Sequence, residues 1–498
     1  MNTMQRFHPL TLVFDFANFL KSFAILVFVV ALNIGSDSWL SRIGRILLVV
    51  SIIFTIVGSV LKWVTRKYAV DELAFHLQNG LVEKTERTVY FDKIQNVQRY
   101  TSFLHKLFGV TSITFETGTS GMNSNVKFDV LERSEADRLE SLVKEFVASD
   151  EKKIESGIES ETETETETET VPKRIVHFTP TRKDTIKASF TSFSFLIILV
   201  IGASLFSKIN RFFDAEERVE GWLASILTSG WVIAGIAIVL ILVSVGIGMI
   251  VTFVRYGKYE IASDENRIYI AKGVLDETAF STLKSRVQAV EITQSFMKRV
   301  LGLAEVKLIS AGDLGDDEDE VSTLYPFLPV KRAYSIISEL LPGYEISLTT
   351  TKLPKKALWA RLIKPYWFWL IATVFLTYFR PEIFRLHYGW LLVSVVFLIL
   401  LAVGRILNYF NTNYALTDQF IQLSEGTFGK TTLLTSRHKV IEVSVKRTKI
   451  QQWMGLATIG IINRAKPVRH DSLADVPIME AKRFYAWYAK RMKEVQLK

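Results

Sequence analysis

The stretches YAVDELAFHLQNG (68–80), YEIASDENRIYIAKG (259–273) and YALTDQFIQLSEG (414–426) each begin with a tyrosine just after an apolar segment and end with a glycine. When the closing glycines are aligned, the apolar positions that follow recur without a gap, and a second glycine comes 29 residues later. The repeated glycines are Gly80, Gly273 and Gly426, then Gly109, Gly302 and Gly455. Such self-similarity indicates one structural unit used three times. Function therefore has to be sought in what three copies do together.

Apolar residues make up 49% of this chain of 498 residues, and they gather in six blocks. The blocks lie near residues 19–34, 43–63, 189–206, 230–254, 366–379 and 389–407. A helix needs about 20 residues to cross the hydrocarbon core of a bilayer. The first and fifth blocks are short enough to be buried helices of a soluble protein instead. However, each block has a partner across a short polar loop, and each pair precedes one repeat. We therefore predict six membrane spans in three pairs.

Lysine and arginine near the ends of the predicted spans give the orientation. These residues are roughly twice as frequent on the side that carries the repeats as in the loops inside each pair, and basic residues mark the cytoplasmic side of a membrane protein. We expect a multi-pass protein of the cell membrane with both termini and all three repeats in the cytoplasm. The first block is not a cleavable signal, because Asp15, Asn18 and Lys21 stand near its start and no small-residue cleavage pattern follows it.

Within each repeat, apolar and polar residues alternate in segments such as 111–117 and 458–462, which is typical of half-buried strands. An amphipathic helix is expected at the end of each repeat, near residues 134–147, 331–341 and 478–492. A short helical turn precedes the second glycine, which is expected to have a positive φ because it ends that turn. Strands with one closing helix over about 80 residues suggest a small sandwich or half-open barrel capped by the helix.

An acidic segment between the first two repeats, ESGIESETETETETET, contains almost no residue that could enter a core. Such composition cannot bury enough apolar surface to offset the entropy of ordering. We predict a disordered linker over residues 150–172. The acidic run at 313–320 is interpreted as a solvated hairpin loop, because it lacks the spaced oxygens and the glycine of a calcium loop.

Catalytic patterns are not found. The chain has no cysteine, no phosphate-binding loop, no zinc-binding HExxH and no nucleophile elbow, and its seven histidines do not cluster. We therefore predict no catalytic residues, no cofactor, no metal site and no enzymatic activity. Basic residues are the better candidates for function, because each one near a bilayer attracts anionic lipid by roughly 1 kcal/mol. The candidate contacts for anionic lipid or a partner are Lys106, Lys298, Arg299, Lys446, Arg447 and Lys449.

The order of these elements resembles a known group. The phrases KIQNVQRYTSFLHKLFGV from Lys93, RVQAVEITQSFMKRVLGL from Arg286 and KVIEVSVKRTKIQQWMGL from Lys439 are similar to the bacterial pleckstrin-homology-like (PH-like) multi-pass membrane proteins of the YdbS/YdbT type. The third copy departs from the pattern: Ile441 replaces the glutamine seen at Gln95 and Gln288, and two glutamines replace Lys298 and Arg299. The resemblance implies a β-sandwich closed by a C-terminal helix and no established enzymatic activity.

The predicted fold class is thus an α+β membrane protein of three tandem units, each a transmembrane helix pair followed by a PH-like β-sandwich or half-barrel with a closing helix. The predicted division is helix pair 1 at 1–67, PH-like domain 1 at 68–149, the linker at 150–172, helix pair 2 at 173–258, PH-like domain 2 at 259–343, helix pair 3 at 344–413 and PH-like domain 3 at 414–498.

The expected function is that of a non-enzymatic membrane scaffold. It would present three cytoplasmic domains at the inner leaflet for protein or lipid binding, with a role in envelope maintenance or resistance to membrane-active agents. The expected partners are membrane lipids and either a related single-unit membrane protein or further copies of this chain, and nucleic acid is not expected. The alternative is a transporter or export component for a small amphipathic molecule, although the predicted spans are poor in the ionisable residues that transporters use.

Overall fold

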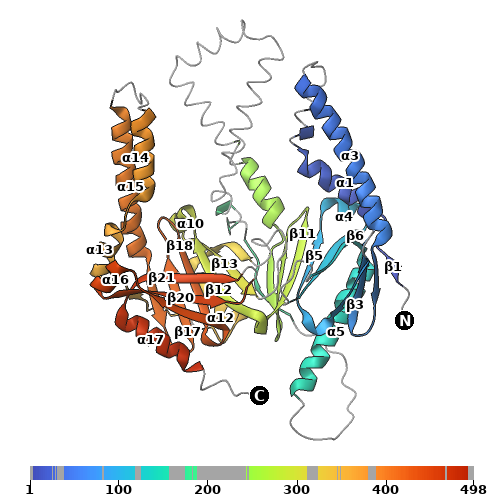
Figure 1. Ribbon diagram of the computed structural model, residues 1–498. Coiled ribbons are helices and arrows are strands. Elements are labelled where there is room, and N and C mark those ends of the chain that lie inside the picture. The colour runs from blue at the N-terminus through green and yellow to red at the C-terminus, as the bar shows by residue number, and fades with distance from the viewer. Residues whose placement is uncertain are drawn as a thin grey trace. The chain divides into compact units, whose positions relative to one another are not determined.

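The computed structural model describes residues 4–24, 39–80, 84–117, 125–155, 174–181, 246–310, 323–344, 349–379, 388–465 and 468–491, with a few isolated positions between them. The described residues form two compact units. Unit 1 is Met1–Lys173 with Leu275–Leu283, and unit 2 is Arg174–Val274 with Lys284–Lys498. Figure 1 shows the elements of both units. The predicted third span, most of the fourth, the acidic run at 313–320 and most of the acidic linker lie outside the described residues.

Unit 1 contains two antiparallel sheets. The first has the order β1-β2-β3-β4, and in the second β5 lies between β6 and β11, with β7 beyond β6. The strands are β1 (Gln5–Arg6), β2 (Lys67–Val70), β3 (Ala74–Asn79), β4 (Thr85–Tyr90), β5 (Ile94–Thr101), β6 (Val110–Thr117), β7 (Val126–Glu132) and β11 (Glu277–Leu283). The helices are α1 (Thr11–Ser22), α3 (Trp39–Thr65), α4 (Phe103–Leu107), α5 (Arg133–Glu155) and the 3-10 turn η1 (Phe91–Lys93).

Aromatic residues fill the space between the two sheets of unit 1. The Phe75 ring packs edge-to-face on Phe91 and Phe128 and at a tilt on Phe115, with ring centroids 4.8 to 5.9 Å apart. The closing helix α5 adds Leu139 and other fully buried apolar side chains to this core. The amphipathic pattern of α5 is thus explained by its packing on the sandwich. The helix continues to Glu155, five residues beyond the point where the linker was predicted to begin.

In unit 2 the strands β8, β9 and β10 pair in that order, and the unit also holds a seven-stranded sheet β14-β13-β12-β18-β17-β16-β15 and a three-stranded sheet β19-β20-β21. Its strands are β8 (Ile175–Phe178), β9 (Glu260–Ser263), β10 (Arg267–Lys272), β12 (Val287–Gln294), β13 (Leu303–Ser310), β14 (Thr323–Pro329), β15 (Thr351–Lys352), β16 (Asn413–Leu416), β17 (Phe420–Glu425), β18 (Lys430–Ser436), β19 (Val440–Lys446), β20 (Leu456–Asn463) and β21 (Arg469–Pro477). Its helices are α10 (Phe296–Val300), α12 (Val330–Leu340), α13 (Lys355–Ile363), α14 (Trp367–Phe379), α15 (Gly389–Asn411), α16 (Lys449–Met454) and α17 (Ile478–Ala489), with the 3-10 turns η2 (Lys284–Arg286) and η3 (Arg437–Lys439).

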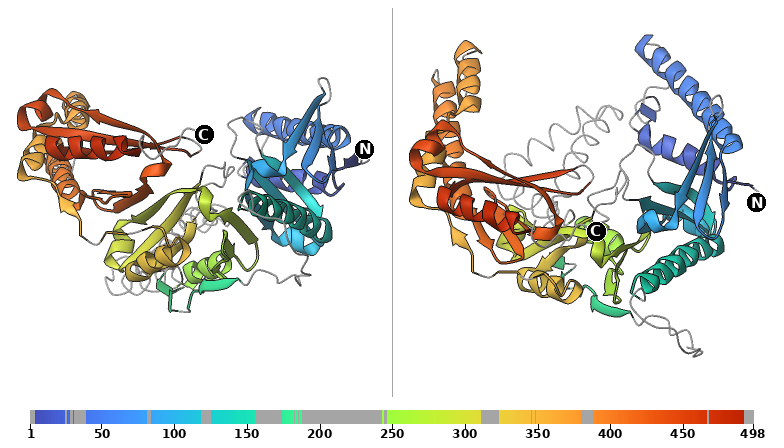
Figure 2. Two further views of the ribbon diagram at one scale, coloured as in Figure 1. Left: turned by 90° about the horizontal axis from the view of Figure 1, so that it is seen from below. Right: turned by 60° about the horizontal axis from the view of Figure 1, so that its bottom comes forward.

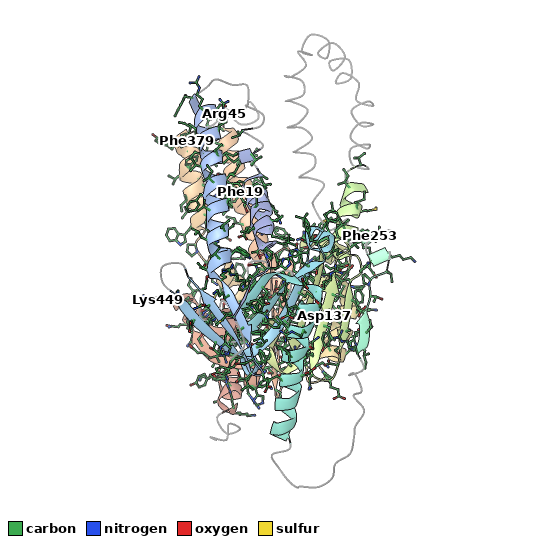
Figure 3. The ribbon with its side chains drawn as sticks, turned by 90° about the vertical axis from the view of Figure 1, so that its right-hand side faces the viewer. Phe19, Arg45, Asp137, Phe253, Phe379 and Lys449 are labelled. Atoms are coloured by element: carbon green, nitrogen blue, oxygen red, sulfur yellow. The ribbon has the colours of Figure 1, made fainter. Side chains whose placement is uncertain are left out.

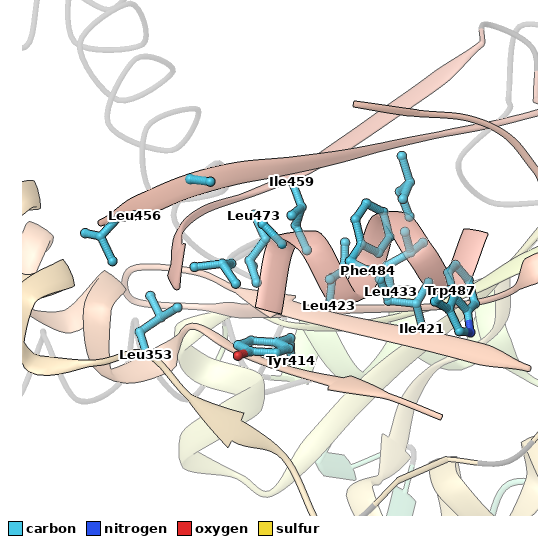
Figure 4. Close-up of a cluster of buried hydrophobic side chains, with 14 of the residues drawn as sticks. Leu353, Tyr414, Ile421, Leu423, Leu433, Leu456, Ile459, Leu473, Phe484 and Trp487 are labelled. Atoms are coloured by element: carbon cyan, nitrogen blue, oxygen red, sulfur yellow. The ribbon is translucent and has the colours of Figure 1, made fainter. Parts of the chain in front are cut away.

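The third repeat buries its own core. Phe484 and Trp487 of α17 lie against Leu423 and Leu433, and Tyr414, the repeated tyrosine, is buried in the same cluster (Figure 4). In the two further views of Figure 2, α17 lies along the sheet strands of its repeat as α5 does in unit 1. The predicted closing helices are therefore observed in all three repeats, as α5, α12 and α17.

Each repeat contains a first strand that the sequence reading did not include. The strands β1, β8 and β15 stand before the apolar segments, and each pairs antiparallel with the strand that begins at or near the repeated tyrosine. In register, Gln5 faces Tyr68 and Thr351 faces Tyr414. The apolar segment is thus inserted between the first and second strands of a sandwich. These strands are only two to four residues long, too short for a periodic signal.

Among the described residues, three helices are long and apolar enough to cross a membrane: Ser41–Thr65, Lys355–Phe379 across α13 and α14, and Gly389–Asn411. They coincide with the second, fifth and sixth predicted spans. No more than 6% of each apolar window is buried in the protein, and Figure 3 shows side chains projecting all around α3, with Arg45 and Phe379 towards the helix ends that lie away from the sheets. Contiguous exposed apolar surface of this extent needs a lipid or protein environment. Gly246–Tyr256, at the end of the fourth predicted span, is a shorter apolar helix.

Candidate functional site

The short helices α4, α10 and α16 carry the basic residues singled out from the sequence, or stand beside them. Each begins after a hydroxyl residue that caps it: Ser102, Ser295 and Thr448 accept a hydrogen bond from the backbone N–H three residues later. Each is followed by its repeated glycine at a positive φ, +70° at Gly109 and +73° at Gly455, as predicted. The same local sequence therefore builds the same short helix three times.

Apolar residues of these short helices point outward, not into the core. The repeated position just before the second glycine is 67% exposed at Leu107, 67% at Val300 and 84% at Trp453. Phe103 and Phe296 at the start of the first two helices are more than half exposed as well. An apolar position kept open in every copy cannot serve the core of its own domain.

The short helices lie at the base of the apolar helices. In unit 1 the His105 ring of α4 packs at a tilt on the ring of Phe14 of α1, with centroids 4.0 Å apart. In unit 2 Arg299 of α10 donates from Nη1 to Oδ1 of Asn411, the last residue of α15, at 2.8 Å. The exposed apolar side chains of α4 and α10 thus stand where α1 and α15 meet the sheets.

Lys106 and Lys298, two of the candidate lipid contacts, form ion pairs within the protein. Lys106 Nζ lies 2.9 Å from Oε1 of Glu277 at the start of β11, and Lys298 Nζ lies 2.5 Å from Oε2 of Glu305. Lys298 also lies 5.3 Å from the centre of the Phe327 ring. These partners, with Asn411 on Arg299, indicate that the three residues help to hold the fold together.

The three candidate residues of the third repeat are exposed. Arg447 donates to the backbone carbonyls of Leu456 and Gln452 at 3.1 and 3.3 Å. Lys446 and Lys449 form no ion pair with any residue that the structure describes. Within the described chain, these two lysines are therefore available to anionic groups.

A buried polar cluster joins the third helix pair to its sheet. Arg361 of α13 donates to Asp475 at 3.1 Å, to Asn408 at 2.7 Å and to Thr412 at 3.0 Å, while Gln451 donates to the other carboxylate oxygen of Asp475 at 2.8 Å. Asp475 is fully buried and has a φ of +67°. A buried charge is tolerated only when it is paired and hydrogen-bonded. The sequence reading missed this cluster, because its members lie far apart along the chain and are not repeated.

A cavity of about 180 Å³ occupies the corresponding junction of unit 1. It is lined by Phe7, Thr11, Asp15, Ser59, Lys62, Trp63, Arg66 and Asp129. Basic and acidic groups are mixed in it, and Arg66 lies 3.7 Å from Asp129. Among the described residues no group of three or more histidine, aspartate or glutamate side chains could hold a metal ion.

Consecutive repeats are linked by strand pairing at two joints, and the two joints have the same register. In unit 1, β5 pairs with β11, the fourth strand of the second repeat, with Arg99 opposite Ala279. In unit 2, β12 pairs with β18, the fourth strand of the third repeat, with Ile292 opposite Thr432. Counted from the closing glycines, these two residue pairs are equivalent. The fifth strand of one repeat thus pairs with the fourth strand of the next repeat.

Comparison with known proteins agrees with this threefold architecture. The family model described as bacterial PH domain matches three times, at residues 19–147, 199–343 and 368–492. The UPF0699 transmembrane protein YdbT of Bacillus subtilis (strain 168) is 22% identical over 506 residues, covering 98% of this chain and 99% of that protein. No solved structure gives a significant match. The resemblance noted in the sequence is confirmed: this chain is a membrane protein that belongs to the bacterial PH domain family and carries the domain three times.

Proposed function

We propose that the chain is a non-enzymatic scaffold of the cell membrane, built from three tandem units that each join a transmembrane helix pair to a PH-like domain. Its domains face the cytoplasm and lie against the inner leaflet, where they bind lipid headgroups and protein partners in the service of envelope maintenance or resistance to membrane-active agents. Tethering raises the effective concentration of the domains for one another and for any multivalent partner.

The observation that carries this proposal is the open apolar position Leu107, Val300 and Trp453. Each stands on a short helix with basic residues on or beside it; α4 contacts α1, α10 contacts α15, and α16 is linked to α13 through Asp475. Apolar side chains flanked by basic ones favour the boundary between headgroups and acyl chains. The helices also leave no room for a flexible spacer, since α3 ends at Thr65 and β2 begins at Lys67. A domain attached in this way stays at the bilayer surface.

Membrane depth tests the proposal directly. Because the chain has no cysteine, a single spin label can be placed at Leu107→Cys, Val300→Cys or Trp453→Cys in the full chain reconstituted into nanodiscs. We expect these labels to be more accessible to oxygen than to a water-soluble nickel relaxant. Glu145→Cys, at an exposed position of α5, is the matched control and should show the aqueous pattern. Aqueous accessibility at all three sites would contradict contact with the leaflet.

Lipid selectivity tests the role of the exposed lysines. Native mass spectrometry of the purified chain with added anionic lipid should show fewer lipid adducts for Lys446→Ala/Lys449→Ala than for wild type. Lys298→Ala/Arg299→Ala is the comparison, because these residues pair within the protein. Equal adduct numbers for wild type and Lys446→Ala/Lys449→Ala would remove these lysines from the proposed lipid contact.

The scaffold role itself is tested by isolation and by flux. A gentle detergent extraction should retain a membrane partner or further copies of the chain, whereas an isolated monomer with no partner would count against a scaffold. Substrate-dependent flux in proteoliposomes containing the purified chain would favour the transporter alternative instead.

A further inference from the structure

The strand β19 lies at the edge of its sheet, whereas the equivalent strands of the first two repeats are paired on both sides. The equivalent strands β5 and β12 each have a neighbour on both sides, β6 with β11 and β13 with β18. Among the strands that the structure describes, β19 pairs only with β20. In the last repeat, the fifth strand therefore has no fourth strand of a following repeat beside it among the described residues.

Exposure shows the difference at a single repeat position. Gln95 on β5 is 5% exposed and Gln288 on β12 is 8% exposed, whereas Ile441 on β19 is 51% exposed. Val445, on the same strand, is 38% exposed. An open strand edge with apolar residues is a template for pairing with another chain. The third repeat has replaced a glutamine by an isoleucine at the one copy of this position that is open.

The chain also contains the matching edge. The strand β4 is the fourth strand of the first repeat. Its equivalents β11 and β18 pair with β5 and β12 at the two joints. Within the described part of the chain β4 pairs only with β3. Its residues Thr85, Glu86, Thr88 and Tyr90 are exposed. Within the described residues, every copy of the chain thus has one fifth strand, β19, and one fourth strand, β4, with an unpaired edge.

We propose that β19 of one copy pairs antiparallel with β4 of a second copy of this chain, in the register of the two joints within the chain. This inference names a partner for the scaffold proposed above and rests on that proposal. The equivalence of Glu86 with Ala279 and Thr432, and of Val445 with Arg99 and Ile292, sets Glu86 opposite Val445. In this register Glu86 is diagonal to Arg447, a favourable cross-strand pair of charges.

The membrane supports such head-to-tail pairing. Each copy is anchored by helices that run directly into its sheets, as α3 runs into β2 and α15 into β16. Copies in one bilayer with one orientation therefore hold their sheets on the same side of the membrane. A heterologous contact of this kind forms rings where the rotation closes and open chains where it does not.

Disulfide trapping tests the pairing. Two differently tagged full-length copies, one with Glu86→Cys and the other with Val445→Cys, are co-expressed and oxidised in the membrane. Opposite residues of antiparallel strands have Cα atoms about 4.5–5.5 Å apart, within the range of a disulfide. We expect a linked product that carries both tags. Arg99→Cys/Ala279→Cys in one chain is the matched positive control, because these equivalent residues face each other across the first joint.

A register control separates pairing from collision. Glu86→Cys with Ser444→Cys places the second thiol one residue away, on the other face of the strand, and should give several-fold less of the product with both tags. The inference is overturned by equal yields from the two combinations. It is also overturned if no dual-tag product forms while the control in the first joint cross-links, or if a copy with both Glu86→Cys and Val445→Cys links only within itself.

The scaffold proposal and this inference fail in different ways. If extraction retains another protein and the dual-tag product is absent, the scaffold stands and pairing between copies is wrong. If extraction yields only a monomer without partner and no dual-tag product forms, both fail.

Discussion

Glu277 and Lys430 occupy one repeat position at the two strand joints with opposite charges. Glu277 pairs with Lys106 at 2.9 Å. Lys430 instead lies near Arg299, and its pKa is lowered, first by burial and second by the positive charge of Arg299. The two joints share a backbone register but differ in electrostatics, so the second joint tolerates a repulsion that the first one does not contain.

Reversing each charge should therefore have opposite effects. Lys430→Glu places a carboxylate near Arg299 and should raise the free energy of unfolding by about 0.5–1 kcal/mol, the range of a partly exposed ion pair. Glu277→Lys sets a second ammonium against Lys106 and should lower it by a similar amount. Thermal unfolding of the purified chain in detergent measures both, and a shift of the same sign in the two variants would refute this account.

The buried pair Arg361–Asp475 gives a larger effect at the scale of residues. Arg361→Met leaves the carboxylate of Asp475 buried with only Gln451 and the half-exposed Lys364 nearby, at 2.8 and 3.4 Å. Removing one partner of a buried pair costs about 3–5 kcal/mol. The double variant Arg361→Met/Asp475→Asn removes the charge and should recover much of that stability, since asparagine tolerates a positive φ. Denaturant midpoints of the single and double variants test this, and no recovery would show that the loss comes from packing.

At the scale of elements, the repeated glycines were predictable but their roles differ. Gly455 has a φ of +73° and open space where a Cβ would stand, so its requirement is one of backbone conformation alone. Gly426 has a φ of +151°, and a Cβ there would lie 2.2 Å from the carbonyl oxygen of Gly429. The first ends a short helix, and the second lets two segments of a strand connection approach closely.

Alanine at these two glycines should therefore destabilise to different extents. Gly455→Ala carries only the cost of a left-handed conformation, about 1–2 kcal/mol, whereas Gly426→Ala adds a backbone clash and should lower the melting temperature further. The comparison needs only the two single variants under one detergent condition. A larger loss in Gly455→Ala would mean that the neighbouring carbonyl moves freely.

Elements with a strong periodic signal were found correctly from the sequence. The closing helices α5, α12 and α17 bury one apolar face, and that face is visible as spaced residues such as Leu139, Val143 and Phe146. The strands β1, β8 and β15 were missed, because two to four residues have no readable period and their pairing partners lie beyond an inserted apolar segment.

At the scale of the whole molecule, the continuous seven-stranded sheet couples the second and third repeats. Strand β18 is hydrogen-bonded to β17 in its own repeat and to β12 in the preceding one. Loss of β18 therefore removes hydrogen-bond partners from both β17 and β12. Unit 2 is therefore expected to unfold as one cooperative body.

Hydrogen exchange checks this coupling. Gly426→Ala, which lies in the third repeat, should speed amide exchange in β12 and β13 as well as in β17 and β18, compared with wild type. Strand β3 in unit 1 serves as the internal reference. Faster exchange confined to the third repeat would mean that the shared sheet does not transmit the loss of stability.

The sequence by itself determined the threefold repeat, the apolar helices and the closing helices, because each leaves a local pattern of spacing or hydropathy. It also pointed to the basic residues near the short helices, but not to their partners. Only the tertiary structure decided that Lys106 and Lys298 pair internally, that Leu107, Val300 and Trp453 stand open, and that consecutive repeats share strands. Those outcomes depend on contacts between residues distant along the chain, on which local spacing carries no information. The repeated sequence thus encodes a domain whose consecutive copies are joined by pairing between the edges of their sheets.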